Sequence, residues 1–200
     1  MHAHPRFQWQ DAAAIRAFVT EKSFGTLIVG TQTAPMIAQV PVVWMGDAVI
    51  GLHLSRANAL VPLLDGTRCL LLVQGPDGYV SPDWYGIDDQ VPTWNYVSAE
   101  LEGLAHVTDD LGLMAIVDAL SGEQERRLLP KEPWTRAKMS DGLFEKMCRA
   151  IIGFRVEVDV VRGTRKLGQN KAESVRLAAA AGIAADGNGV LAALMRSEGD

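Results

Sequence analysis

Alternating hydrophobic and polar positions are clearest in two segments of the chain. From Val97 to Val107 the odd-numbered positions are apolar or small. The even-numbered positions are polar, with Leu104 as the exception. The segment from Phe154 to Val160 repeats the alternation. A period of two places successive side chains on opposite faces of a strand, so both segments predict strands with one buried face. Gly103 predicts a bend in the first of them.

Short apolar runs bounded by turn residues predict four more strands. These runs are Phe24–Gly30, Pro35–Trp44, Ala48–Leu54 and Thr67–Gln74. Gly46-Asp47 is a turn signal and predicts an antiparallel hairpin between the second and third runs. Pro41 indicates an edge or a bulge, because proline cannot donate a hydrogen bond to a neighbouring strand.

Apolar residues at helical spacing predict helices between and after these strands. The expected helices run from Asp11 to about Lys22, from Thr108 to about Leu120 and from Asp141 to about Ile151, with a short one at Leu60–Leu64. We expect the second to bury Leu111, Met114, Val117 and Leu120, and the third to bury Leu143, Phe144, Met147 and Ile151. The alanine-rich C-terminal region is expected to be helical and broken at Gly182 and at Asp186-Gly187.

The order of these elements predicts a mainly β, α+β fold. Short antiparallel strands with inserted helices, and no regular β-α-β alternation, favour an antiparallel Greek-key barrel, closed or split, with peripheral helices. The 200 residues are enough for one domain with a sizeable core. We expect residues 1–161 to form the barrel with its inserted helices, and residues 162–200 to add a basic loop and a helical segment to the same domain.

Composition narrows the classes of function. The net charge of −5 and the isoelectric point near 5.4 argue against general nucleic-acid affinity, although a local basic patch is compatible with them. No apolar run reaches the length of a membrane span, and the N-terminus lacks a signal-peptide pattern, so a cytoplasmic protein is expected. Cys69 and Cys148 lie in apolar surroundings and are expected to be buried, reduced thiols.

The stretch from Gln74 to Tyr96 concentrates aromatic and turn residues. It contains Trp84, Trp94 and all three tyrosines, together with three of the nine prolines. The Gly-Pro and Ser-Pro pairs predict that most of it is neither regular helix nor central strand. A stiff loop with flat faces suits recognition of a flat ligand or a partner surface. An aromatic plug at one end of a barrel explains the same composition equally well.

The string HLSRAN places Ser55, Arg56 and Asn58 where a strand is expected to end and a helix to begin. A hydroxyl, a guanidinium and helix N-terminal amides together form an anion site that suits a phosphate. An N-cap serine beside a solvated arginine is the competing interpretation, and the string alone favours it.

The string RGTRKLGQNK, from Arg162 to Lys171, gathers four cations and two glycines. It could close over a phosphate or contact nucleic acid, but a solvated loop is the more ordinary interpretation. His53 and His106 have no metal-ligand spacing around them, so no metal site is predicted. We find no catalytic triad and no acid–base pair, and no catalytic residue is assigned.

Four strings resemble the PaiB family, the FMN-binding negative transcriptional regulators. They are HLSRAN (53–58), QGPDGYVSPDWY (74–85), VPTWNY (91–96) and KLGQN (166–170), in the family's order and spacing. The resemblance spans about residues 5–180. It implies an FMN-binding split barrel similar to pyridoxamine-phosphate oxidase and the flavin reductases, assembled as a homodimer with flavin at the subunit interface.

The resemblance also implies a set of cofactor contacts. Ser55, Arg56 and Asn58 would hold the FMN phosphate, and His53, in the same string, is counted among the cofactor contacts. Gln74, Thr93, Trp94 and Asn95 would line the isoalloxazine ring. Lys166, Gln169 and Asn170 would approach from the C-terminal loop of the same or the partner subunit.

Three functions are compatible with this site. The first is a negative transcriptional regulator or flavin sensor, although the charge gives no support to strong DNA binding. The second is a flavin-dependent oxidoreductase that passes electrons from reduced nicotinamide to a small acceptor. The third is a haem-binding split barrel, which would need His53 or His106 as an axial ligand.

Overall fold

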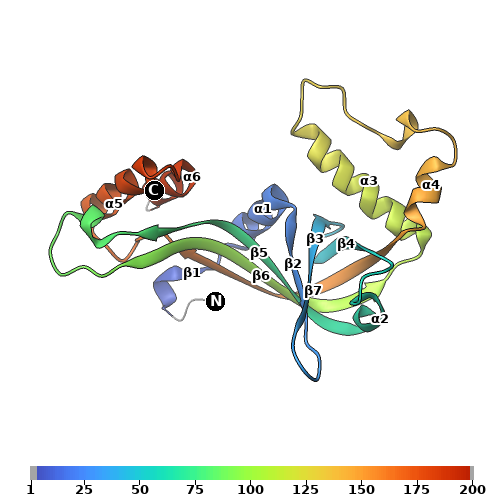
Figure 1. The fold of residues 1–200 in the computed structure, drawn as a ribbon, viewed down its shortest axis with the longest axis horizontal. Coiled ribbons are helices and arrows are strands. Elements are labelled where there is room, and N and C mark those ends of the chain that lie inside the picture. The colour runs from blue at the N-terminus through green and yellow to red at the C-terminus, as the bar shows by residue number, and fades with distance from the viewer. Residues whose placement is uncertain (1–3, 199–200) are drawn as a thin grey trace. The chain divides into compact units, whose positions relative to one another are not determined.

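The computed structural model describes residues 4–198 and contains an antiparallel barrel with peripheral helices (Figure 1). The strands are β1 (Gln8–Trp9), β2 (Phe24–Val29), β3 (Met36–Trp44), β4 (Val49–Ser55), β5 (Thr67–Val80), β6 (Thr93–Val107) and β7 (Ile151–Lys166). The helices are α1 (Ala12–Lys22), α2 (Val61–Leu64), α3 (Asp110–Arg126), α4 (Leu143–Cys148), α5 (Glu173–Ala185) and α6 (Gly189–Arg196). The 3-10 turns are η1 (Pro5–Phe7), η2 (Pro82–Tyr85) and η3 (Arg136–Lys138).

Six strands close into a barrel, which confirms the predicted fold class. Their order is β7-β4-β3-β2-β5-β6, and β6 pairs back to β7, so the ring has no free edge. β1 is added outside this ring, with Gln8 opposite Thr164. Alternate residues of each strand point inward, and the barrel core includes the fully buried Leu27, Val40 and Leu52.

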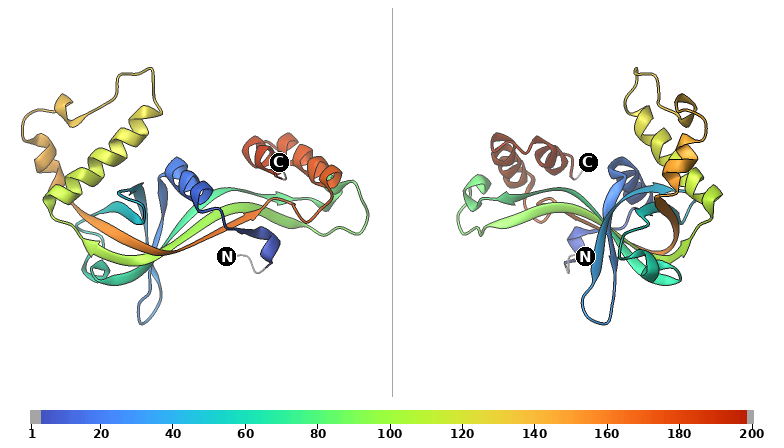
Figure 2. Two further views of the ribbon diagram at one scale, coloured as in Figure 1. Left: turned by 180° about the vertical axis from the view of Figure 1, so that it is seen from behind. Right: turned by 45° about the vertical axis from the view of Figure 1, so that its right-hand side comes forward.

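The described chain forms two compact units. We call residues 16–73 and 100–161 the barrel unit, and residues 4–15, 74–99 and 162–198 the hairpin unit. β5, β6 and β7 each contribute to both units. Helices α3 and α4 belong to the barrel unit, and α5 and α6, which pack side by side, belong to the hairpin unit (Figure 2). No helix among residues 4–198 has both the length and the apolarity to cross a membrane.

The aromatic stretch is more regular than predicted. β5 continues to Val80 and β6 begins at Thr93, so the irregular part shrinks to residues 81–92, which include η2. The pairing of β5 with β2 ends at Leu72. Pro76 therefore lies on a part of β5 where β2 supplies no partner, and its missing N–H breaks no bond to that strand.

The last strand is also longer than predicted. β7 runs to Lys166, so the expected loop from Arg162 to Lys171 is wrong in its first half. The short β1 pairs with the last part of β7, where Trp9 lies opposite Gly163. Gly163 allows this close approach, since a Cβ there would lie 2.9 Å from the Cβ of Trp9.

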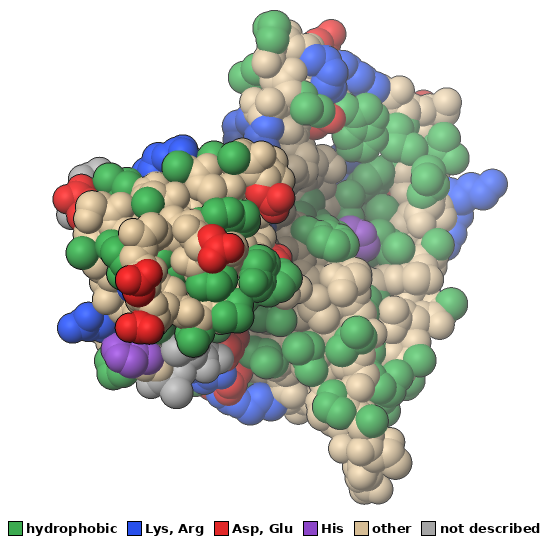
Figure 3. All heavy atoms as spheres, turned by 60° about the vertical axis from the view of Figure 1, so that its left-hand side comes forward, with side chains coloured by type: hydrophobic (Ala, Val, Ile, Leu, Met, Phe, Trp, Pro, Cys, Tyr) green, Lys and Arg blue, Asp and Glu red, His purple; other side chains and the backbone are tan. Residues whose placement is uncertain are grey.

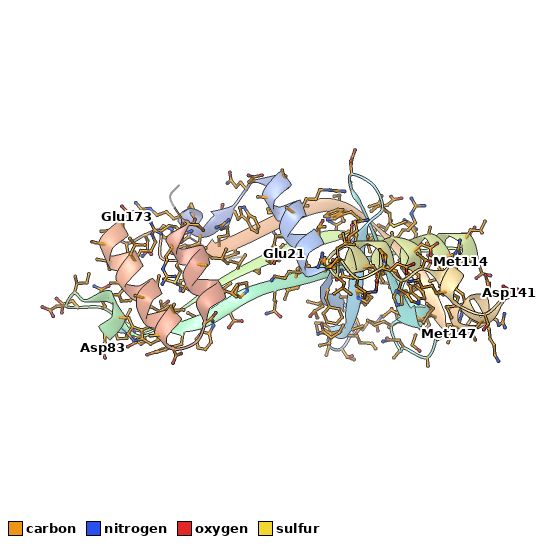
Figure 4. All side chains as sticks on the ribbon, turned by 90° about the horizontal axis from the view of Figure 1, so that it is seen from above. Glu21, Asp83, Met114, Asp141, Met147 and Glu173 are labelled. Carbon is orange, nitrogen blue, oxygen red and sulfur yellow. The ribbon has the colours of Figure 1, made fainter. Side chains whose placement is uncertain are left out.

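The buried faces of two helices differ from the prediction. In α3 the buried residues are Leu113, Ile116 and Leu120, whereas Leu111 is 75% exposed. Contact with the barrel decides this face, because Gly51 on β4 lets Ile116 approach to a point where a Cβ would lie 2.7 Å away. Helix α4 is shorter than expected: it buries Phe144 and Cys148 and leaves Leu143 and Met147 exposed, while Ile151 already starts β7. Met114 and Met147 are labelled in Figure 4.

The C-terminal region forms two helices, with the break at Asp186-Gly187 confirmed. The break predicted at Gly182 is wrong, because α5 continues through it to Ala185. Gly182 instead serves packing, since the Trp84 side chain of η2 lies against it. Asp83 and Glu173 mark the first turns of η2 and α5 in Figure 4.

Candidate functional site

The predicted phosphate residues lie together in the barrel unit, at the end of β4 and in the turn before α2. Their oxygens organise this turn. Ser55 Oγ accepts the Ala57 N–H at 3.3 Å, and Asn58 Oδ1 accepts the Leu60 N–H at 2.9 Å. The Asn58 N–H donates to the Ser55 carbonyl at 2.9 Å. The amides that sequence reasoning offered to an anion are therefore already bonded within the turn.

Arg56 is the group in this turn whose chemistry still suits a phosphate. It is exposed, and its Nε donates to the Arg149 carbonyl at 3.0 Å, while its backbone N–H donates to the Ala150 carbonyl at 3.0 Å. Two bonds to the segment before β7 hold the base of the side chain. The guanidinium keeps its charge, and the Ser55 hydroxyl can donate beside it. Such a donor set suits an anion such as a phosphate, bound through side chains rather than through helix amides.

The predicted ring residues lie in the hairpin unit, where Trp94 presents an exposed face. Its indole is 52% exposed, and Nε1–H donates to Asp77 Oδ1 at 2.8 Å. Tyr79 meets it edge-on, with ring centroids 6.1 Å apart. Asn188 fixes Asp77 in turn by donating to its carbonyl at 2.8 Å. This flat surface is held in place and open to solvent, which is what stacking on a flavin requires.

Two lysines, Lys166 at the end of β7 and Lys171 in the loop after it, reach the same hairpin. Lys166 Nζ donates to Thr93 Oγ1, so two predicted cofactor residues are in direct contact. Burial lowers the pKa of Lys166 from its ordinary value. Lys171 donates to Gln90 and lies over the Tyr85 ring. The two cations are therefore held against the hairpin at Thr93 and at Gln90 and Tyr85.

Other predicted residues do not turn toward a ligand. Asn95 is 1% exposed, and its amide contacts Met195 Sδ at 3.4 Å. Gln169 accepts the Leu167 N–H at 2.8 Å and donates to the Arg165 carbonyl at 2.6 Å, so its amide closes its own turn. Gln74 and Asn170 are exposed. Asp77 and Tyr79, which were not among the predicted site residues, both contact the Trp94 indole.

His53 lies on β4 but belongs to a separate hollow in the barrel unit. Its Nδ1 is buried without a hydrogen-bond partner among the described residues, and burial lowers the pKa of the imidazole. Trp134, in the connector after α3, and Pro41, on β3, line the same hollow. Within residues 4–198 no three His, Cys, Asp or Glu side chains gather as a metal site.

The two cysteines are free and buried, as predicted. Burial raises the pKa of Cys69 to about 11, so its thiol stays protonated at neutral pH. A protonated, enclosed thiol is a poor nucleophile. Neither cysteine adds chemistry to the two groups of residues described above.

The fold defines the class first: solved structures of similar fold include flavin-binding split barrels. One is the FAD and heme binding protein from Mycobacterium smegmatis, with a TM-score of 0.57 and 18% identity over 80% of this chain and 74% of that one. Another is the flavocytochrome Anf3 from Azotobacter vinelandii, with a TM-score of 0.57 and 18% identity over 84% of this chain and 73% of that one. At this identity the likeness shows the fold.

The sequence then defines the family. Residues 1–160 match the family described as "Putative FMN-binding domain", and the chain belongs to it. A curated relative, the Bacillus subtilis (strain 168) "Protease synthase and sporulation protein PAI 2", is 28% identical over 178 residues, which cover 87% of this chain and 84% of the relative. The resemblance to the PaiB family and the expectation of FMN as the cofactor are thus confirmed. Lys166, Gln169 and Asn170 lie beyond the residues matched by the family.

Proposed function

We propose that the protein is a cytoplasmic, FMN-binding homodimer that acts as a regulator or flavin sensor. The observation that carries this proposal is the exposed Trp94 indole, fixed by Asp77, in a chain of an FMN-binding family. Bound FMN would supply a redox-active ring whose state can be sensed. No acid–base pair in the described residues favours an enzyme over a sensor, so NAD(P)H oxidation with added FMN is the assay that separates the two.

Each group of predicted residues is proposed by itself as a set of FMN contacts, the first within the barrel unit and the second within the hairpin unit. Arg56 and Ser55 would bind the phosphate by charge-assisted hydrogen bonds. Trp94 and Tyr79 would contact the isoalloxazine ring. Asn95 and Gln169 are left out of this proposal, because their amides are bonded within the hairpin unit.

Comparison of FMN with riboflavin tests the two groups separately, because riboflavin lacks the phosphate. Arg56→Ala should weaken FMN binding about tenfold or more and leave riboflavin binding unchanged. Trp94→Ala should weaken both several-fold, since it removes stacking. The controls are Arg126→Ala, which removes an exposed cation of α3, and Ile87→Ala, whose side chain is 49% exposed in the loop between β5 and β6. Equal losses for FMN and riboflavin in Arg56→Ala would rule out its phosphate role.

The homodimer is proposed on an apolar outer face of the barrel unit. Ile28 lies opposite Ile37 on β3 and opposite Leu70 on β5, and all three point away from the barrel core. Ile37 is 63% exposed, and Phe24 on the same side of β2 is 53% exposed. Exposed apolar patches of this kind mark interaction sites.

Sedimentation measures the dimer directly. Ile37→Asp would place a charge in this face and should shift the protein to monomer, whereas Val190→Asp, at a side chain 65% exposed on α6, should leave the dimer intact. A monomeric wild-type protein, or a dimer that tolerates Ile37→Asp, would reject this face as the interface.

A further inference from the structure

A hollow in the barrel unit has the size and lining of a small-molecule pocket. Its volume is about 460 Å³, within the range of about 300–1,000 Å³ that ligand pockets occupy. It is lined by Lys22, Ser23, Phe24, Pro41, His53, Val117, Leu120, Ser121, Gln124, Glu125 and Trp134. These come from the α1–β2 junction, β3, β4, α3 and the connector after α3. Figure 3 shows hydrophobic side chains gathered on a hollowed surface of the molecule.

Specific hydrogen bonds hold the wall that contains Trp134. Its backbone N–H donates to Glu125 Oε2 at 2.7 Å, and Lys131 Nζ donates to the same oxygen. These bonds lower the pKa of Glu125, the Lys131 contact being the larger cause, so the carboxylate stays charged at neutral pH. The backbone of Trp134 is thus fixed at the hollow, although the residue belongs to a connector with little regular structure.

The opposite wall, at the α1–β2 junction, is pinned in a similar way. Arg127 donates to the Glu21 carbonyl at 2.6 Å, to the Thr20 carbonyl, and to Ser23 Oγ at 3.2 Å. Ser23 has a φ of 50°, a left-handed backbone that a non-glycine residue adopts at some cost. Such a conformation persists where surrounding contacts over-determine it. Both walls of the hollow are therefore preformed.

The chemistry of the lining selects the occupant. Phe24, Val117 and Trp134 give apolar and aromatic surface. The two charged residues already have partners, Lys22 with Glu21 at 3.3 Å and Glu125 with Lys131, so neither calls for a ligand charge. His53 supplies a neutral imidazole with an unsatisfied Nδ1, and rotation about its Cβ–Cγ bond can present either nitrogen. Arg56 and Ser55 do not line the hollow.

We propose that this hollow is a second ligand site, which binds a small uncharged aromatic molecule that packs on Trp134 and hydrogen-bonds to His53. The site goes beyond flavin binding, because it lies within the barrel unit and uses none of the residues proposed for the phosphate or the ring. A ligand there would bridge α3 and the connector to β3 and β4.

A matched pair of probes tests the proposal. β-Naphthol is a fluorescent, uncharged bicycle with one O–H donor, and its methyl ether has the same ring without the donor. We expect saturable binding of β-naphthol to the full chain, about tenfold weaker in Trp134→Ala. His53→Phe should lose about tenfold for β-naphthol and nothing for the ether, because only the naphthol makes the hydrogen bond. Ser121→Phe should fill the hollow and abolish binding of both probes.

The variants also separate this site from the flavin site. Trp134→Ala should retain FMN as well as the wild type does, while Trp94→Ala should retain β-naphthol binding. Far-ultraviolet circular dichroism confirms folding, and Trp134→Phe keeps an aromatic ring if the alanine variant fails to fold. Non-saturable binding, equal affinity in Ser121→Phe, or a Soret band on haem addition that is lost in His53→Phe would each overturn the proposal.

Discussion

Gly182 in the middle of α5 gives a sharp test of how the hairpin unit is packed. A Cβ at this position would lie 2.3 Å from Cγ of Trp84, 2.5 Å from Cδ2 and 2.8 Å from Cδ1. Carbon atoms settle at about 3.5–4.0 Å, so Gly182→Ala would force the indole to move by about 1 Å or more. Helix α5 and the turn η2 would separate at the point where they meet.

Two opposing effects set the magnitude. Alanine is about 1 kcal/mol better than glycine inside a helix, which by itself would stabilise α5. Overpacking a fitted contact costs about 1–3 kcal/mol, and Trp84 is half-buried against α5. We therefore expect Gly182→Ala to lower the free energy of unfolding by about 1–2 kcal/mol.

Urea unfolding followed by circular dichroism measures this change, and two further variants interpret it. Gly122→Ala in α3 has Arg126 Nη1 as its nearest atom, at 3.8 Å, so it should gain about 0.5–1 kcal/mol. In a Trp84→Ala background the clash is gone, and Gly182→Ala should become stabilising as well. If Gly182→Ala stabilises the otherwise wild-type protein as much as Gly122→Ala does, the packing of Trp84 on α5 is wrong.

Three other perturbations have defined outcomes. Gly103→Ala should cost at least about 3 kcal/mol in urea unfolding, because its Cβ would lie 2.1 Å from the Glu157 carbonyl oxygen and backbone cannot move aside. Asp77→Leu should weaken flavin affinity by loosening Trp94, whereas Asp77→Asn, which keeps an acceptor, should bind nearly as well as the wild type. Glu125 has a lowered pKa, so its contribution to stability is present above the ordinary glutamate pKa and is lost as pH falls below it; the melting temperature of Glu125→Gln should show less of this acid dependence.

The barrel was predictable because its strands carry their own local signal. Alternation from Val97 to Leu101 and the apolar run of β2 both follow from burial of one face, and the structure retains them. The lengths of β5 and β7 were not predictable from local composition. They depend on long-range pairing, such as Trp9 opposite Gly163, which overrides the loop character of Gly163 and its neighbours.

The buried face of α3 shows the same limit at the level of packing. Leu111 and Leu113 are equally apolar, and spacing alone gives no reason to prefer one. The barrel decides, because Gly51 on β4 provides the space that Ile116 enters. Gly182 is a parallel case. Its sequence context predicts a helix break, but in the structure it lies within α5 and gives space to the Trp84 ring.

The sequence predicts which residues belong to the candidate site. It does not predict which of their hydrogen-bonding groups are left to bind a ligand. The motifs select the polar side chains of Ser55, Asn95 and Gln169 as ligand contacts. In the structure Ser55 and Gln169 bond to nearby backbone N–H groups, and Asn95 contacts the sulfur of Met195. What remains for a ligand is the charge of Arg56 and the exposed face of Trp94. Both side chains are exposed to solvent. Salt should therefore weaken FMN binding more through Arg56 than through Trp94, because screening weakens a phosphate contact and leaves stacking in place.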